Sequence, residues 1–223
     1  MNIKIKTTSK WEKWRVGTFY DKEPETIAWI NDFTDNAVFW DIGANIGIYS
    51  LWCAYRHPAS IIHAFEPLRT NFIRLWENIF LNNFSHITAH YLCVGNSNED
   101  CWFTAHTTVA GSSGGQACET AGSGAHIQRM PMATGDSLVF RGWYGRCLTP
   151  NYIKIDTDGN ELDILNGMPL VLGRSSLRGM LVEINGSEAR IHDLAKKKGL
   201  VPDEKYNKLK NRSSDHNVIF RRV

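Results

Sequence analysis

Short runs of apolar residues alternate along this chain with stretches in which apolar residues recur at helical spacing. Uninterrupted apolar runs of this length are typical of strands buried on both faces of a parallel sheet. Five runs have this character: Ala37–Trp40, Ser60–Phe65, Ile87–Val94, Tyr152–Ile155 and Gly179–Ile184. The C-terminal stretch "HNVIFRRV", which follows the polar turn "NRSSD", predicts one further strand.

The segments between these runs predict amphipathic helices. After the second run, "RTNFIRLWENIFLNN" places five apolar residues on one helical face: Phe72, Leu75, Trp76, Ile79 and Phe80. A later helix is expected to begin at an N-cap, Ser187, and to end at Gly199. The order strand, helix, strand therefore predicts an α/β fold.

The alternation stops between Gly95 and Pro150. There the helical period is poor, and "AGSSGGQACETAGSGA" is rich in glycine and serine, which predicts a long flexible loop. Such a loop is either a disordered surface insertion or a lid over the substrate. With 223 residues the chain is long enough for one sizeable core. We expect a helical lead-in segment over residues 1–36 and a single domain over 37–223, with the insertion at about 95–150.

Composition excludes several classes of protein. Lys and Arg number 25 against 23 Asp and Glu, so the formal net charge of +2 lacks the basic excess of most nucleic-acid-binding proteins. The five cysteines show no C-x-x-C spacing, which fits a reducing, cytoplasmic location. Neither a signal peptide nor an apolar stretch of membrane-spanning length is visible, so we expect no contact with membranes.

A turn of small residues joins the first predicted strand to a helix in "VFWDIGANIGIYSLW". The strand ends at Asp41, Gly43 and Ala44 follow, and Gly47 opens a helix that is expected to end near Arg56. In open α/β sheets, ligands bind beside such a turn at the carboxyl ends of the strands. These residues are therefore candidates for binding a cofactor.

The spacing of the glycines discriminates between cofactors. The dinucleotide fingerprint G-x-G-x-x-G needs glycine at positions 43, 45 and 48, but Asn45 and Ile48 stand at two of them. Asparagine tolerates the left-handed conformation that such a turn requires. The pattern D-x-G-x-N-x-G is therefore closer to the turn of S-adenosylmethionine (SAM) methyltransferases than to that of nicotinamide enzymes.

A carboxylate stands at the end of the next predicted strand. In "IIHAFEP", Glu66 precedes Pro67 and lies 19 residues beyond Gly47, where it can accept hydrogen bonds from both hydroxyls of a ribose. Glycine turn and acid together predict a nucleoside site.

Four blocks of this sequence resemble the FkbM family of SAM-dependent methyltransferases. They are "FWDIGANIGIYSL", "HAFEPLRTNFIRLWENIFLNN", "YIKIDTDGNELDILNG" and "LVEING", and "FYDKEPE" before them is similar to the family's lead-in. The resemblance implies a class I methyltransferase (Rossmann-like) fold, with a seven-stranded, mostly parallel sheet, an antiparallel last strand and helices on both faces. It also implies methylation of a hydroxyl, often on a sugar or natural product. Asp158 departs from it, since the family commonly has Glu there.

Charged residues crowd the end of the strand in "YIKIDTDGNELDIL". Lys154 enters a sheet buried on both faces and needs a charged partner, for which Asp41 and Glu183 are the candidates. Asp158 and Glu161 fit a capping box at the start of the next helix. Asp156 has no such structural explanation and lies where catalytic groups gather, so we expect it to act in catalysis with Lys154 and Glu183.

The acceptor atom is inferred by elimination. The Asn-Pro-Pro-aromatic motif of many amino-directed enzymes and the Pro-Cys nucleophile of carbon-directed ones are both missing. A hydroxyl acceptor needs a base or a metal, and Asp156 is the first candidate for the base, with His106 and His126 as alternatives. A magnesium ion held by Asp156, Asp158, Glu183 and Asn185 is a less favoured possibility. We expect a small-molecule or glycan acceptor.

Two other function classes remain open. A nicotinamide dehydrogenase shares the sheet and the ribose-binding acid, although Asn45 and Ile48 disfavour it. A binding protein of this fold without catalysis would lack the acids around Asp156. The sequence indicates neither the acceptor's identity nor the oligomeric state.

Overall fold

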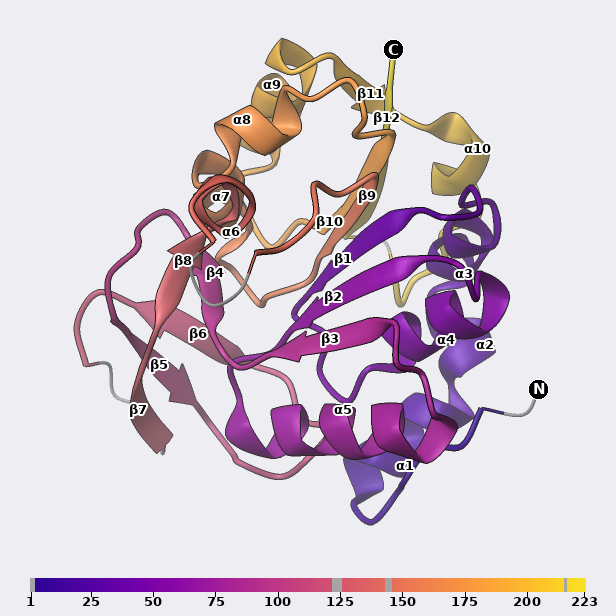
Figure 1. Cartoon of the computed structure of the whole chain (residues 1–223), viewed down its shortest axis with the longest axis vertical. Helices are drawn as coiled ribbons and strands as arrows, with labels where there is room; N and C mark the ends of the chain where they lie inside the picture. The colour runs from indigo at the N-terminus through magenta and orange to yellow at the C-terminus, as the bar shows by residue number, and fades with distance from the viewer. Residues whose placement is uncertain (1–2, 122–125, 143–145, 215) are drawn as a thin grey trace.

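A computed structural model describes residues 3–121, 126–142, 146–214 and 216–223, and its centre is a seven-stranded sheet (Figure 1). The strand order is β11-β12-β10-β9-β1-β2-β3. The bounds are β1 (Val38–Ile42), β2 (Ile61–Phe65), β3 (Ile87–His90), β9 (Tyr152–Ile155), β10 (Gly179–Glu183), β11 (Leu200–Pro202) and β12 (Asn217–Arg222).

The pairing confirms the predicted sheet. β1, β2, β3, β9 and β10 are parallel neighbours, whereas β12 runs antiparallel to both β10 and β11. Every residue of β9 is buried, as the apolar runs predicted. The predicted strand Ile87–Val94 is instead two strands, because the chain leaves the main sheet after His90 and β4 (Cys93–Gly95) pairs with another strand.

Helices cover both faces of the sheet, and each face has its own hydrophobic core (Figure 1). Alternate residues of each strand serve the two cores, so that Phe39 and Tyr152 face one and Trp40 and Ile153 the other. The helices are α1 (Lys10–Gly17), α2 (Phe19–Lys22), α3 (Pro24–Asn31), α4 (Ile48–Arg56), α5 (Arg69–Asn82), α6 (Gly135–Phe140), α7 (Glu161–Asn166), α8 (Pro169–Leu172), α9 (Glu188–Lys197) and α10 (Glu204–Asn207).

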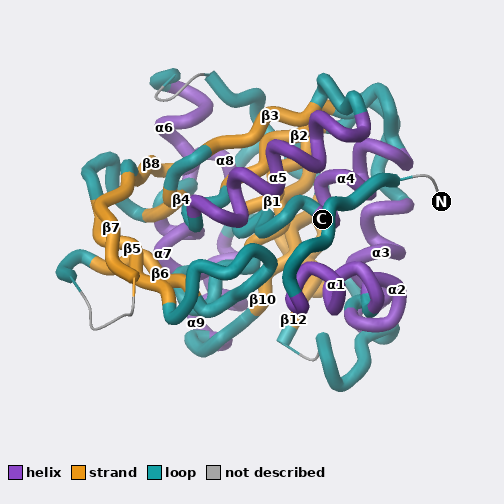
Figure 2. Tube along the Cα trace, turned by 90° about the horizontal axis from the view of Figure 1, so that it is seen from below, coloured by secondary structure: helices purple, strands orange, loops and turns teal. Residues whose placement is uncertain are grey.

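The prediction of one long loop over 95–150 is wrong in its secondary structure. The described residues form a three-stranded antiparallel sheet of β5 (Cys101–Ala105), β6 (Gly115–Cys118) and β7 (His126–Met130), followed by β8 (Met132–Thr134) and α6. Figure 2 shows this sheet at the opposite end of the molecule from α2 and α3. Its strands are short and only partly buried, which explains why their apolar pattern is faint.

The lead-in segment is fixed to the domain by a buried ion pair. Glu12 of α1 is fully buried, and its Oε1 lies 3.1 Å from Nη1 of Arg74 on α5. Its other oxygen accepts from the backbone of Thr8 and Ser9, and Ser9 caps the helix in return. α1 therefore has a defined position against α5.

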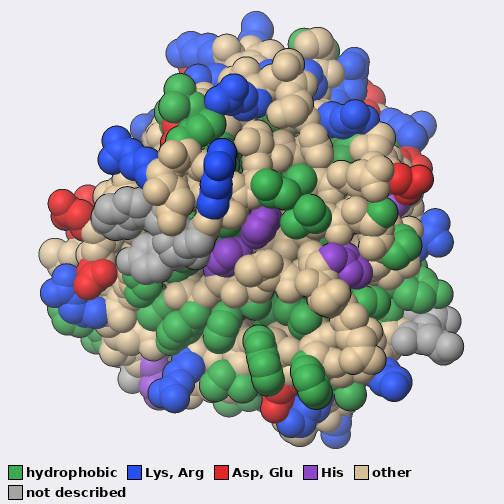
Figure 3. Space-filling view, viewed as in Figure 1, with side chains coloured by type: hydrophobic (Ala, Val, Ile, Leu, Met, Phe, Trp, Pro, Cys, Tyr) green, Lys and Arg blue, Asp and Glu red, His purple; other side chains and the backbone are tan. Residues whose placement is uncertain are grey.

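The outer face of α5 differs from its prediction. Leu75 is fully buried, but Trp76 and Phe80 are 57% and 71% exposed and stack on each other. Figure 3 shows hydrophobic side chains gathered over α5 on this face. The apolar stripe is wider than the part of the helix that the core covers. No helix among the described residues has the length and apolar character required to span a membrane.

The two sides of α5 should respond differently to truncation. Leu75→Ala should lower the free energy of unfolding by about 2–5 kcal/mol, because it empties a packed core position. Phe80→Ala should change it by no more than about 0.5 kcal/mol, because that ring lies mostly in solvent. Urea denaturation of both variants measures the difference, and equal losses would contradict the assignment of faces.

Candidate active site

The loop after β1 approaches the neighbouring strand too closely for any side chain at position 43. Gly43 has a φ of +82°, and a Cβ there would lie 1.8 Å from the backbone oxygen of Asp156. Gly47 has a φ of +88°, and a Cβ would lie 2.4 Å from Cδ1 of Leu75. Asn45 is left-handed at φ 52°, as the sequence predicted. The loop thus presents its backbone at the carboxyl end of the sheet.

Glu66 lies beside this loop at the end of β2. Its Oε2 accepts from the backbone N–H of Asn45 at 2.7 Å, and its Oε1 accepts from that of Leu68 at 2.8 Å. Burial raises the pKa of Glu66 to about 7, against the lowering effect of these hydrogen bonds. The carboxyl group is therefore held in place and poorly solvated, ready to exchange hydrogen bonds with a ligand.

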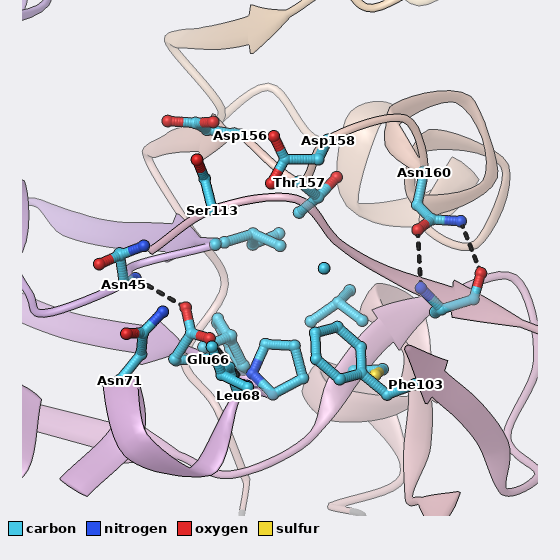
Figure 4. A pocket seen from close by; sticks show the side chains of 18 of the residues that line it. Asn45, Glu66, Leu68, Asn71, Phe103, Ser113, Asp156, Thr157, Asp158 and Asn160 are labelled. Atoms are coloured by element: carbon cyan, nitrogen blue, oxygen red, sulfur yellow. Dashed lines mark hydrogen bonds between the residues drawn. The ribbon is translucent and has the colours of Figure 1, made fainter. Parts of the chain in front are cut away.

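Gly43, Asn45, Glu66 and Pro67 all line one cavity, which we call the main cavity (Figure 4). Asp156, Thr157 and Asp158 lie on one side of it, with Glu66, Leu68 and Phe103 opposite. A smaller side cavity adjoins it and is lined by Ala44, Lys154 and Tyr49. The sheet topology thus brings most of the predicted site residues together.

Asp41 and Gly47 line neither cavity. Asp41 is buried and accepts a 2.6 Å hydrogen bond from Oγ of Ser50, so it secures the start of α4 to β1. Its role is to support the loop.

A strap of residues 110–117, which comprises the end of the connection from β5 and most of β6, lines the cavity. Asn45 and Asn71 both donate side-chain hydrogen bonds to the backbone oxygen of Ser112, at 2.7 and 3.1 Å. On the other side, Asp158 accepts from the N–H of Gly114, and Asn160 exchanges two hydrogen bonds with the backbone of Ala117 (Figure 4). The glycine- and serine-rich stretch is therefore bonded to both walls of the main cavity.

Lys154 is paired with a different residue from those the sequence suggested. Its side chain is 1% exposed and its ammonium lies 2.6 Å from Oδ2 of Asp156, whereas Asp41 and Glu183 were the expected partners. Burial disfavours the charged amine, but Asp156 and Asp41 outweigh it and raise the pKa of Lys154. Residues two apart on a strand share a face, so the pairing follows from the alternation. Asp156 therefore has a structural role.

Asp156 also lies beside Glu183, because β10 pairs with β9 in parallel. The Lys154 ammonium outweighs burial and lowers the pKa of Asp156. The negative charge of Asp156, together with burial, raises the pKa of Glu183 to about 8. At neutral pH the pair of carboxyl groups thus holds one proton, and this proton is mostly on Glu183.

The predicted capping box at α7 is wrong. The N-cap is Asn160, and Asp158 has a left-handed φ of 55° with its side chain directed to the strap. Glu161 accepts from the N–H of Gly159 at 2.8 Å. The helix begins at Glu161, two residues later than the motif assumes.

The acidic residues at this edge do not converge as a metal site. Among the described residues, the group of three potential ligands within 4.8 Å of one another is His63, His90 and Cys147, outside both cavities. Nε2 of His63 accepts from the N–H of Leu148, so its Nδ1 carries the proton and donates to Nε2 of His90 at 3.0 Å. This cluster is explained as a buried hydrogen-bond chain.

Sequence reasoning missed several residues of the main cavity. Trp14, Arg15 and Lys22 come from the lead-in segment, and Phe103 and Ser112 from the insertion. The resemblance of "FYDKEPE" to a family lead-in was a signal for Lys22 alone. His106 and His126, the alternative bases, line neither cavity.

Comparison with known proteins assigns the chain to a family. Residues 41–199 match the family described as the methyltransferase FkbM domain. The hexuronic acid methyltransferase AglP of Haloferax volcanii is 29% identical over 174 residues, which are 78% of this chain and 66% of the relative. Methyltransferase 1 of Beauveria bassiana is 27% identical over 149 residues, 61% of this chain and 60% of that protein. The chain thus spans less than two thirds of the length of these relatives.

Solved structures agree on the fold. A precorrin-6y C5,15-methyltransferase from Geobacter metallireducens has a TM-score of 0.51 at 13% identity, covering 98% of this chain and 93% of its own. A protein of the NADB-Rossmann superfamily from Streptococcus agalactiae has a TM-score of 0.52 at 10% identity, covering 99% and 71%. At such identities the likeness concerns the fold alone.

Gly43 and Gly186 offer a matched pair of substitutions. Both are left-handed, at φ +82° and +106°, but a Cβ at Gly186 would meet nothing within 4 Å. Gly43→Ala should therefore destabilise the protein by about 1–3 kcal/mol more than Gly186→Ala, because only the former adds a clash. Chemical denaturation measures both, and equal losses would show that the loop can move away from Asp156.

Proposed function

The chain belongs to the family of methyltransferase FkbM domains, and we propose that it transfers a methyl group from SAM to a hydroxyl oxygen of a small acceptor. The observation that carries the proposal is the position of Glu66 beside the left-handed loop Gly43–Gly47 in one cavity with Asp156 and Glu183. A ribose-binding acid and a pair of acidic groups thus lie at adjacent parts of one site.

The residues present fit SAM. Glu66 offers a buried carboxyl group to the ribose hydroxyls, and Leu68 and Phe103 offer apolar surface to an adenine. Gly43 lines the cavity and projects no side chain into it, so a ligand can approach its backbone closely. Gly43, Ala44, Asn45, Glu66 and Pro67 are thus the proposed cofactor-binding residues, with Asp41 and Gly47 supporting the loop.

Glu183 is a better base than Asp156. When bound, SAM supplies an electrophilic methyl group on a sulfonium. The Asp156 carboxylate is neutralised by Lys154 and has a lowered pKa, so it is a weak proton acceptor. Glu183, with a pKa of about 8, is matched to accept a proton near neutral pH once it is ionised. We therefore assign removal of the acceptor proton to Glu183 and orientation of the acceptor to Asp156. Lys154 holds Asp156 in position.

A sugar acceptor, free or in a glycan, is the substrate class we propose. The relative from Haloferax volcanii is named for a hexuronic acid, which supports a sugar as acceptor over a natural product of another class. We also propose that the strap opens to admit ligands and then closes over them. Its contacts to Asn45, Asn71, Asp158 and Asn160 are hydrogen bonds that can break one by one.

Calorimetric titration with SAM, S-adenosylhomocysteine and NAD tests the proposal, followed by a methyl-transfer assay on a panel of glycans. The proposal predicts binding of the first two ligands and methylated product. Binding of NAD alone would favour a dehydrogenase, and binding of SAM without transfer to any acceptor would favour a non-catalytic role.

Replacing the ribose acid should weaken binding of the nucleoside. Glu66→Gln removes the charge yet keeps the shape, so the Kd of SAM should rise by the equivalent of about 1–3 kcal/mol. The Kd of adenosine should rise by a similar factor, because the lost bonds are to the ribose. Calorimetry measures both, and Glu188→Gln, on exposed α9, is the control. An unchanged Kd for Glu66→Gln would place the ribose elsewhere.

The rate of transfer should depend on the ionisation of Glu183. Only the ionised form accepts a proton, so kcat should increase from pH 6, reach half its maximum at or below about pH 8, where the pKa of Glu183 lies, and level off about one pH unit above that midpoint. Glu183→Gln should lower kcat by about 10²–10⁴ and remove this dependence.

Asp156→Asn is the contrasting variant. It removes the carboxylate that directly contacts the buried Lys154 ammonium, so it should lower the free energy of unfolding by about 3–5 kcal/mol, whereas Glu183→Gln should not destabilise the protein. If Glu183→Gln retains full kcat while folded Asp156→Asn is inactive, then Asp156 is the base instead.

A further inference from the structure

Arg15 of α1 is a cation without a charged partner in the main cavity. It lines both the main and the side cavity. Its Nε donates to the backbone oxygen of Gly111 at 2.6 Å, and among the described residues it makes no ion pair. A guanidinium has five N–H donors in a rigid fork, so the Nη groups remain available to a ligand.

The surrounding structure holds Arg15 in place. α1 is fixed by the buried ion pair of Glu12 and Arg74, and Oγ of Ser9 donates to the backbone oxygen of Ala110 on the strap. Arg15 therefore joins the lead-in helix to the strap at the cavity. A side chain tethered at Nε loses less conformational entropy when its other donors bind a ligand.

The neighbouring cation is already compensated. Lys22 also lines both cavities, but its ammonium pairs with Glu23. Arg15 acts at longer range on Glu66, which is buried, and on Asp158, which is half-buried, and the two lie on opposite sides of the cavity. Among the described residues that line the cavity, Arg15 is thus a cation with no carboxylate in ion-pair contact.

We propose that Arg15 binds a carboxylate of the reactants in this site, a role that rests on the proposed function. A planar carboxylate matches the guanidinium fork, and two such groups can be present: the methionyl carboxylate of SAM and that of an acidic sugar acceptor. Trp14, which precedes Arg15, also lines the main cavity.

Two pairs of ligands, each differing only in the carboxylate, distinguish the methionyl carboxylate of SAM from the carboxylate of an acidic sugar. Wild-type protein, Arg15→Gln and Arg15→Lys are titrated with SAM and with decarboxylated SAM. Transfer is then compared between methyl β-D-glucuronide and methyl β-D-glucoside. Lys13→Gln is the matched control, because it removes one positive charge from the exposed side of the same helix.

In one of the two pairs, Arg15→Gln should reduce the affinity or the kcat/KM for the ligand that bears the carboxylate by about 10- to 100-fold. The same quantity for the ligand of that pair without the carboxylate should not change. Loss of the preference for SAM assigns the methionyl carboxylate, and loss of the preference for the glucuronide in kcat/KM assigns the acceptor. Arg15→Lys should retain part of the preference, and it serves as the test variant if Arg15→Gln does not fold.

Equal effects on both members of each pair, or an effect no larger than that of Lys13→Gln, overturn the role of Arg15 while the proposed function stands. Wild-type protein that binds no SAM and transfers no methyl group overturns both.

Discussion

The buried ammonium of Lys154 is the constraint on which the site depends. An unpaired charge at that depth costs several kcal/mol, so the fold must supply carboxylates around it. Asp156 provides the direct contact and Asp41 a second negative charge from the neighbouring strand. Because Asp156 is held by this pair, its charge acts in turn on Glu183 and raises the pKa of that group. A structural requirement of the core thereby sets the chemistry at the cavity surface.

The second constraint is the close packing of the β1 loop on β9. Gly43 leaves no room for a Cβ above the backbone oxygen of Asp156, so the loop and the ion pair have a fixed relation. The strap and α1 close the same cavity from outside, through the bonds of Asn45 to Ser112 and of Arg15 to Gly111. Segments far apart in the sequence thus meet at one site (Figure 2).

The sheet could be predicted from sequence because its strands are buried on both faces and read as continuous apolar runs. The glycine loop and Glu66 could be predicted because they lie at fixed distances from strand ends. The insertion could not, since half-buried strands such as β6 have no distinct apolar pattern. The residues that Lys154, Arg15 and the strap contact could not be predicted either, because these contacts are tertiary. The alternation on β9 does place Lys154 and Asp156 on one face, although the partners predicted for Lys154 lie on the neighbouring strands.

The proposed transfer requires the sulfonium of SAM to lie near the carboxyl pair of Asp156 and Glu183, because the acceptor oxygen must meet both the methyl group and the base. The most direct test is calorimetry of SAM and of S-adenosylhomocysteine, which lacks the sulfonium charge, at pH 7 in buffers of different ionisation enthalpy. Glu183 is mostly protonated at that pH, and the sulfonium charge should favour its ionised form. Binding of SAM should therefore release up to about one proton more than binding of S-adenosylhomocysteine. Glu183→Gln should abolish the difference. Equal proton release by the two ligands in the wild-type protein would contradict the account.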